Sequence, residues 1–178
     1  MFLKLNNVAF CALVLLPMAA IAPAPMSSMA HASAASARHA EEAAIERVMK
    51  QFHDAVVTHN GAALSGLFLP DANIWLNVLT GDAYDRAQAK GAKGPKVRVG
   101  SYRDFAKFVS TTSKTLDPEH SNVVIHTDGT IAAVYFDFVF NIDGKAENRG
   151  NETWQLVKTA DGWRIAAICY SSDPATLQ

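Results

Sequence analysis

Residues 130–171 read TIAAVYFDFVFNIDGKAENRGNETWQLVKTADGWRIAAICYS, and this stretch decides the fold. Its many aromatic and β-branched residues are typical of strands. The pairs Asp143-Gly144 and Asp161-Gly162 divide it, and Asp-Gly pairs favour the tight turns of β-hairpins. A further pair, Asp128-Gly129, separates it from an earlier strand-like run. We therefore expect consecutive antiparallel strands at residues 120–127, 130–142, 147–158 and 162–171.

The residues before these strands predict helices and one more strand. Apolar side chains recur at helical spacing between residues 40 and 59, and a short second helix is predicted at 62–68, where Pro70 ends it. Residues 71–78 alternate polar and apolar side chains, as in a half-buried strand. The hydroxyl of Ser101 can cap a later helix. Helices followed by a run of strands predict one α+β domain, with helices packed on one face of a curved sheet.

The N-terminal residues have the pattern of a secretory signal peptide. Lys4 supplies a positive charge, and an apolar run over residues 8–21 follows it. Ala-x-Ala triplets after this run suit a signal peptidase, which predicts a signal peptide over residues 1–37 and a mature domain over 38–178. The alternative is an uncleaved membrane anchor, which the triplets disfavour. We therefore expect a periplasmic or secreted protein with no stable membrane anchor after cleavage.

Charge and cysteine content narrow the possible functions. The sequence has 178 residues and a formal net charge of -1, so no overall positive field attracts nucleic acid. Cleavage of the signal peptide would remove Cys11 and leave Cys169 alone, so the mature domain could form no intrachain disulfide. No side chains have the spacing of a known metal motif, so neither a metal nor another cofactor is expected.

Residues 81–99 differ in character from the segments on either side. They are rich in glycine and lysine and have no apolar periodicity, which predicts a long flexible loop with a basic face. This loop could be a solvated connector between two elements. It could also act as a gate, or as a lid that steers anions.

The turn at Asp143-Gly144 sets a register for the hairpin on either side of it. If these two residues alone form the turn, Tyr135 lies opposite Glu152. In that register Tyr135, Asp137, Glu152 and Trp154 share one face of the sheet. That face grades from apolar to polar along the strands, as expected for a pocket with an apolar end and a polar mouth.

The same register places three aromatic side chains on the opposite face. They are Phe136, Phe138 and Phe140, and their neighbours on that face are mostly polar. Three exposed aromatic rings are costly to leave in water. We therefore expect a second copy of the chain to cover this face in a homodimer.

Three segments carry a resemblance to a known family. They are Phe68-Leu69-Pro70-Asp71-Ala72 before a strand, Val99-Gly100-Ser101-Tyr102 before a helix, and residues 152–166 with two tryptophans. Together they resemble the SnoaL-like and ketosteroid-isomerase-like proteins of the nuclear transport factor 2-like superfamily, over residues 41–172. The resemblance implies a cystatin-like cone, in which a curved, mainly antiparallel sheet wraps around the N-terminal helices. It also implies frequent dimers and a pocket used for isomerisation, hydrolysis, cyclisation or simple binding.

The chain departs from the ketosteroid isomerases of that superfamily at two positions. Phe52 stands where they carry a tyrosine, and Leu76 stands near the position of their aspartate base. Steroid isomerase activity is therefore not expected. The carboxylate and histidine that a SnoaL-type cyclase would need also cannot be paired from the sequence.

Eight residues are candidates for the site. The candidate catalytic residues are Asp137, Glu152, Tyr135 and His53, and the candidate ligand-binding residues are Phe52, Trp75, Phe105 and Trp154. Two carboxylates in a partly dry pocket could separate into an acid and a base, with Tyr135 or His53 assisting. The alternatives are that the carboxylates lie at a wet rim or pair with Arg149 or Arg103, and that His53 is a solvated helix residue.

The sequence as a whole favours an exported domain that binds a small apolar or amphipathic molecule. The first alternative is an isomerase, cyclase or hydrolase that uses a pocket carboxylate as its general base. The second alternative is a protein-interaction or dimerisation module that uses the face carrying Phe136, Phe138 and Phe140.

Overall fold

The computed structural model describes residues 26–71 and 73–177, so the predicted signal peptide up to residue 25 lies outside the described residues. The helices are α1 (Met26–Val57), α2 (Gly61–Ser65), α3 (Gly81–Ala89), α4 (Tyr102–Thr111) and the short 3-10 helix η1 (Ala175–Leu177). The strands are β1 (Ile74–Leu79), β2 (Val97–Val99), β3 (Leu116–Thr127), β4 (Ile131–Ile142), β5 (Lys145–Thr159) and β6 (Gly162–Ser172). None of the described helices is both long and apolar enough to cross a membrane.

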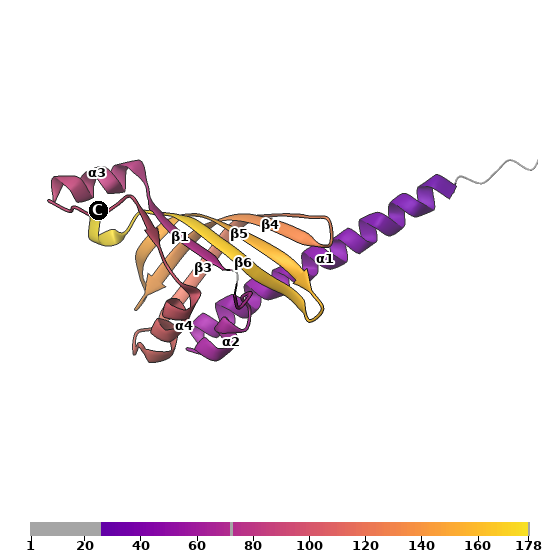
Figure 1. The fold of residues 1–178 in the computed structure, drawn as a ribbon, viewed down its shortest axis with the longest axis horizontal. Coiled ribbons are helices and arrows are strands. Elements are labelled where there is room, and N and C mark those ends of the chain that lie inside the picture. Colours follow the sequence, from indigo (N-terminus) through magenta and orange to yellow (C-terminus); the bar gives the residue numbers. More distant parts are fainter. Residues whose placement is uncertain (1–25, 72, 178) are drawn as a thin grey trace, which may run out of the picture.

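The strands form one mixed sheet in the order β2-β1-β6-β5-β4-β3. All neighbours are antiparallel except β1 and β6, which run parallel. The sheet curves around α1, α2 and α4, which lie against one of its faces, while α3 and the C-terminus lie together at one end (Figure 1). The predicted α+β architecture, a curved sheet wrapped around N-terminal helices, is confirmed.

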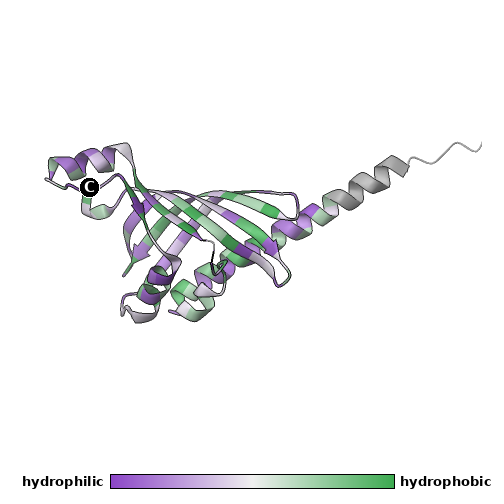
Figure 2. Ribbon diagram, in the orientation of Figure 1, coloured by the Kyte–Doolittle hydropathy of each residue, from purple (hydrophilic) through white to green (hydrophobic). Residues whose placement is uncertain are grey.

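The core forms where the helices meet this inner face of the sheet. The apolar stripe predicted on the first helix is buried there, and it consists of Ile45, Val48, Met49, Phe52 and Val56. From the sheet, Trp154, Leu156, Ile165 and Ile168 pack against it. Apolar residues run along the strands and α2, whereas α3 is largely hydrophilic (Figure 2).

The predicted register of the β4–β5 hairpin is wrong by one residue. The turn has the positive φ angles of a tight hairpin, 52° at Asp143 and 73° at Gly144. A bulge follows, however, because Asn141 pairs with Ala146 while Phe140 pairs with Asn148. The extra residue in β5 shifts every later pairing by one residue, so that Phe136, not Tyr135, lies opposite Glu152. The side chains of β4 that were expected on one face of the sheet therefore lie on the other.

This exchange corrects the predicted dimer face. Phe136 and Phe138 are buried and Phe140 packs against the same core, so these three rings belong to the interior of the domain. Tyr135, by contrast, points outward with 49% of its surface exposed. Burying three aromatic rings stabilises the fold far more than an unbulged turn would, which explains why the strand turns this way.

The predicted loop over residues 81–99 is also wrong in part. Residues 81–89 form α3, whose N-terminus is capped by the Thr80 hydroxyl, which accepts a hydrogen bond from the Ala83 backbone N–H. Residues 97–99 form the edge strand β2, and only the segment between them lacks helix or strand. The first helix likewise begins at Met26 instead of residue 40, in a stretch rich in alanine, the residue with the strongest helix propensity.

Candidate functional site

A cavity of about 180 Å³ lies between the inner face of the sheet and helices α1 and α4. Most of its wall is aromatic, formed by Phe52, Trp75, Phe105, Phe138, Phe140 and Tyr170. Few residues with polar groups line it: Glu152 and Asn148 on β5, His120 on β3, and Tyr170 on β6 through its phenol. A larger and more open hollow, about 550 Å³, lies beside Ile131 on the outside of the sheet, and no buried ionisable group lines it within the described residues.

The aromatic rings of the cavity wall contact one another in a chain. Phe105 lies at its centre, 6.1 Å from Phe52, 5.4 Å from Trp75 and 6.0 Å from Phe140 between ring centroids. Tyr170 meets both Trp75 and Phe138 at 87°. Helix α4 and strands β1, β4 and β6 thus each contribute rings, and the rings hold one another in place.

Glu152 brings a carboxyl group into this apolar space. It lies opposite Phe136 on one side and Tyr170 on the other, so it points to the inner face. The indole N–H of Trp154, which is fully buried behind the cavity, donates a hydrogen bond to Oε1 of Glu152. Burial raises the pKa of Glu152 to about 7, and the Trp154 bond only partly opposes this effect. The carboxyl group is therefore ready to gain or lose a proton near neutral pH.

His120 and Tyr170 surround Glu152 as neutral groups. The His120 ring lies 4.5 Å from the Phe136 ring and 5.9 Å from the Trp154 ring. Burial, together with the nearby His53, lowers the pKa of His120 to about 4, so the imidazole is uncharged at neutral pH. The pKa of Tyr170 is raised, first by burial and further by Glu152, which keeps its phenol protonated.

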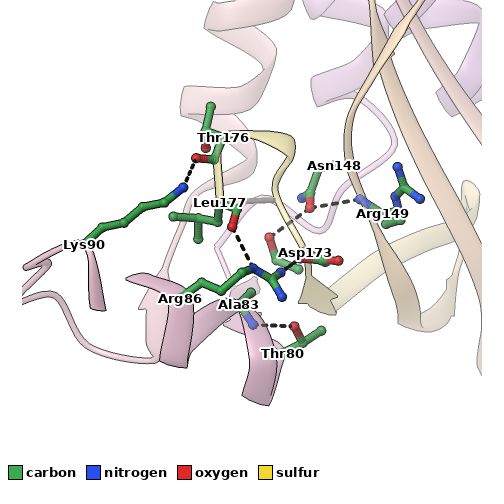
Figure 3. Close-up of polar contacts among 10 residues, drawn as sticks. Thr80, Ala83, Arg86, Lys90, Asn148, Arg149, Asp173, Thr176 and Leu177 are labelled. Atoms are coloured by element: carbon green, nitrogen blue, oxygen red, sulfur yellow. Dashed lines mark hydrogen bonds and ion pairs between the residues drawn. The ribbon is translucent and has the colours of Figure 1, made fainter. Parts of the chain in front are cut away.

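The position of Asn148 depends on the C-terminal segment. The buried hydroxyl of Ser172 donates to Oδ1 of Asn148 at 3.0 Å. The backbone N–H of Arg149 donates to the same oxygen (Figure 3). Beyond Ser172, Asp173 forms an ion pair with Arg86 of α3, whose Nε also donates to the Leu177 carbonyl at 2.6 Å. Helix α3 therefore holds the C-terminus beside the strand end that carries Asn148.

Solved structures from several bacteria share this architecture. A nuclear transport factor 2-like protein with a cystatin-like fold from Novosphingobium aromaticivorans is 12% identical and covers 82% of this chain and 90% of its own, with a TM-score of 0.59. A protein of unknown function from Mycobacterium tuberculosis is 15% identical over 78% of this chain and 75% of its own, with a TM-score of 0.58. This chain has the nuclear transport factor 2-like fold.

Some other solved structures with this fold are named after an enzymatic activity. A candidate scytalone dehydratase from Novosphingobium aromaticivorans is 16% identical over 78% of this chain and 88% of its own, with a TM-score of 0.58. At such identities the likeness concerns the fold alone. No family model and no curated protein matches the sequence.

Four of the predicted site residues meet at the cavity of this domain. Phe52, Trp75 and Phe105 line its wall, and Glu152 projects into it. Trp154 lies one layer deeper, with its ring 5.0 Å from Phe52. It supports the wall and holds Glu152 without lining the cavity itself.

The structure places the other three predicted residues elsewhere, which corrects the predicted site. Tyr135 and Asp137 lie on the outer face, because the bulge exchanged the faces of β4. Asp137 accepts hydrogen bonds there from the side-chain amides of Asn122 and Asn151, not from an arginine. His53 is half-exposed and lines a neighbouring groove, which shares Pro118 and His120 with the cavity. Its Nε2 lies 3.3 Å from Oδ1 of Asp117.

Sequence reasoning missed His120, Asn148 and Tyr170 as site residues. The unbulged register places the phenylalanines of β4 on the opposite face, so it gives no indication of the cavity that two of them line together with Tyr170. His120 could have been found from period-two spacing, because it follows the buried Leu116 and Pro118 on the same face of β3. No group of three or more metal-ligating side chains gathers in the described part of the chain.

Proposed function

We propose that this protein binds a small organic molecule in its inner cavity, after export from the cytoplasm. One observation carries the proposal: an aromatic cavity of about 180 Å³ that encloses a single carboxyl group, Glu152, with a pKa raised to about 7. Ligand sites are concave and mostly apolar, with a few polar groups that orient the ligand. The volume is below the range of about 300–1,000 Å³ that holds drug-sized molecules, which favours a much smaller ligand.

Binding can be tested with small aromatic probes and a variant that fills the cavity. We expect phenol or indole to bind wild-type protein saturably, one molecule per chain, in isothermal titration calorimetry. Phe140→Trp adds volume to the cavity wall and should abolish this binding. Phe108→Trp is the matched control, because Phe108 is a partly exposed residue of α4 that does not line the cavity. Equal binding by Phe140→Trp and wild type would contradict the proposal.

A second function, acid–base catalysis, is favoured by the pKa of Glu152. A carboxyl group with a pKa near 7 can take a proton from a bound substrate and return it at neutral pH. Tyr170, directly opposite on β6, remains protonated and can donate a hydrogen bond to a substrate oxygen. These groups would suit an isomerase, cyclase, hydrolase or dehydratase acting on a small carbonyl compound.

Replacement of Glu152 separates binding from catalysis. In a screen of small hydroxy-carbonyl compounds, Glu152→Gln should lower the turnover of an active compound by about 10²–10⁴-fold while the protein still binds it. A variant that keeps its full turnover would rule out Glu152 as the base.

Export rests on the predicted signal peptide and has its own test. When the full-length chain is expressed in a bacterium with its native N-terminus, we expect the mature protein in the periplasm or medium. Intact-mass measurement should place the new N-terminus between about Ser33 and Arg38. A chain that keeps Met1 and stays in the membrane fraction would support the uncleaved anchor instead.

A further inference from the structure

The cavity contains an acidic group without a basic partner. Glu152 is the only carboxyl group that lines it, and no Lys or Arg is present among the described lining residues. Among the described residues, its carboxyl group has one hydrogen bond, from the Trp154 indole. An unpaired carboxylate inside a protein is costly, so a cation that reached this space would be strongly favoured beside it.

The rings that line the wall around this acid meet at several angles. Tyr170 stands at 87° to both Trp75 and Phe138, and Phe140 stands at 62° to Phe105. Phe52, by contrast, is nearly parallel to Phe105, at 15°. The faces of aromatic rings attract cations, and the attraction is strongest in sites that exclude water. No lysine or arginine of the described chain lies over any of these rings.

We propose that the cavity binds a small organic cation, an amine or quaternary ammonium group that lies against the aromatic rings and pairs with the carboxylate of Glu152. This inference rests on the proposed function, because it assigns a ligand class to the same cavity. The charge of the cavity favours a cation over an anion, since Glu152 lines it and no lysine or arginine is among its described lining residues. It also favours a compact ligand, because about 180 Å³ must hold both the charged group and its substituents.

A neutral ligand that is bound without reaction would use two features only weakly. The charge of a desolvated carboxylate would have no opposite charge beside it, and the aromatic rings would act only as an apolar wall. A cation uses both features at once. It would also stabilise the ionised form of Glu152, so binding should lower the pKa of this residue and release a proton below pH 7.

The other titratable groups around Glu152 do not reverse this pH dependence. Tyr170 on β6 has a raised pKa and stays neutral, and His120 on β3 is neutral above about pH 4. His53 on α1 lies beyond His120, and Arg98 on β2 is exposed and acts on Tyr170 from outside the cavity. Among the described residues that line the cavity, Glu152 is therefore the one that gains negative charge between pH 5.5 and 8.5.

The test compares choline with 3,3-dimethylbutan-1-ol, which has the same shape but a carbon in place of the charged nitrogen. Choline keeps its charge at every pH, so only the protein titrates. In calorimetry at pH 8.5, we expect choline to bind wild type at least about tenfold more tightly than the alcohol. This preference should shrink at pH 5.5 and in Glu152→Gln at either pH. Glu119→Gln is the matched control, because Glu119 is an exposed residue of β3 outside the cavity.

The other possible results distinguish a failure of the cation inference from a failure of the proposed function. Saturable binding of the alcohol with equal or higher affinity would overturn the cation inference and leave the proposed function intact. Binding of phenol without binding of choline would have the same meaning. If choline, the alcohol and phenol all fail to bind wild type, the proposed function falls together with the inference. Because the pH dependence is measured on wild type, the test does not depend on how well Glu152→Gln folds.

Discussion

Burial raises the pKa of Glu152 from 4.5 to about 7, so between these values the folded protein holds a proton that the unfolded chain releases. This contribution to stability is full below about pH 4.5 and is lost as the pH rises to about 7, which costs about 3 kcal/mol. Glu152→Gln removes the titration and can still accept the Trp154 hydrogen bond. We expect its stability in urea denaturation to match wild type near pH 4.5 and to exceed it by about 3 kcal/mol at pH 8. A difference between the two proteins that stays constant with pH would show that Glu152 is not desolvated.

Gly100 controls the position of Trp75 in the cavity wall. A Cβ atom on Gly100 would lie 2.7 Å from Cδ1 of Trp75, so Gly100→Ala must displace the indole. We expect a loss of about 1–3 kcal/mol in stability, a shifted tryptophan emission and weaker phenol binding. Gly81→Ala is the control, because a Cβ there meets no atom within 4 Å. Identical emission spectra for Gly100→Ala and wild type would show that Trp75 does not move.

Helix α3 acts as an element that fixes the C-terminus. Arg86 pairs with Asp173 and donates to the Leu177 carbonyl, and Lys90 donates to the Thr176 carbonyl at 3.2 Å. Arg86→Ala should therefore release the segment after β6, at a cost of about 1 kcal/mol. Hydrogen–deuterium exchange should become faster in residues 173–177 and in the Asn148 region. Lys93→Ala, in the neighbouring loop, should leave both regions as protected as in wild type.

The elements were largely predictable from the sequence, but their pairing was not. Asp-Gly turns and period-two runs correctly located the C-terminal hairpins, because both signals are local. The bulge at Phe140 and Asn141 depends on which face of β4 packs against the helices, which is a property of the whole core. One inserted residue moved Tyr135 and Asp137 out of the predicted site and brought in Phe138 and Phe140. Helix α3 was missed for a similar reason, because much of its support comes from its contacts with the C-terminal segment.

At the scale of the whole molecule, the outer face of the sheet is a better candidate for a dimer interface than Phe136, Phe138 and Phe140, which belong to the interior. Apolar side chains remain open to solvent across it, with 58% of Ile74, 60% of Ile131 and 49% of Tyr135 exposed. Since such a face is costly in water, we propose that a second copy covers it. Light scattering after size-exclusion chromatography should give a dimer at micromolar concentration, and Tyr135→Glu should give a monomer that still binds the cavity probes. Val57→Glu, which places the same charge on α1, should remain dimeric, and a monomeric wild type would contradict the proposal.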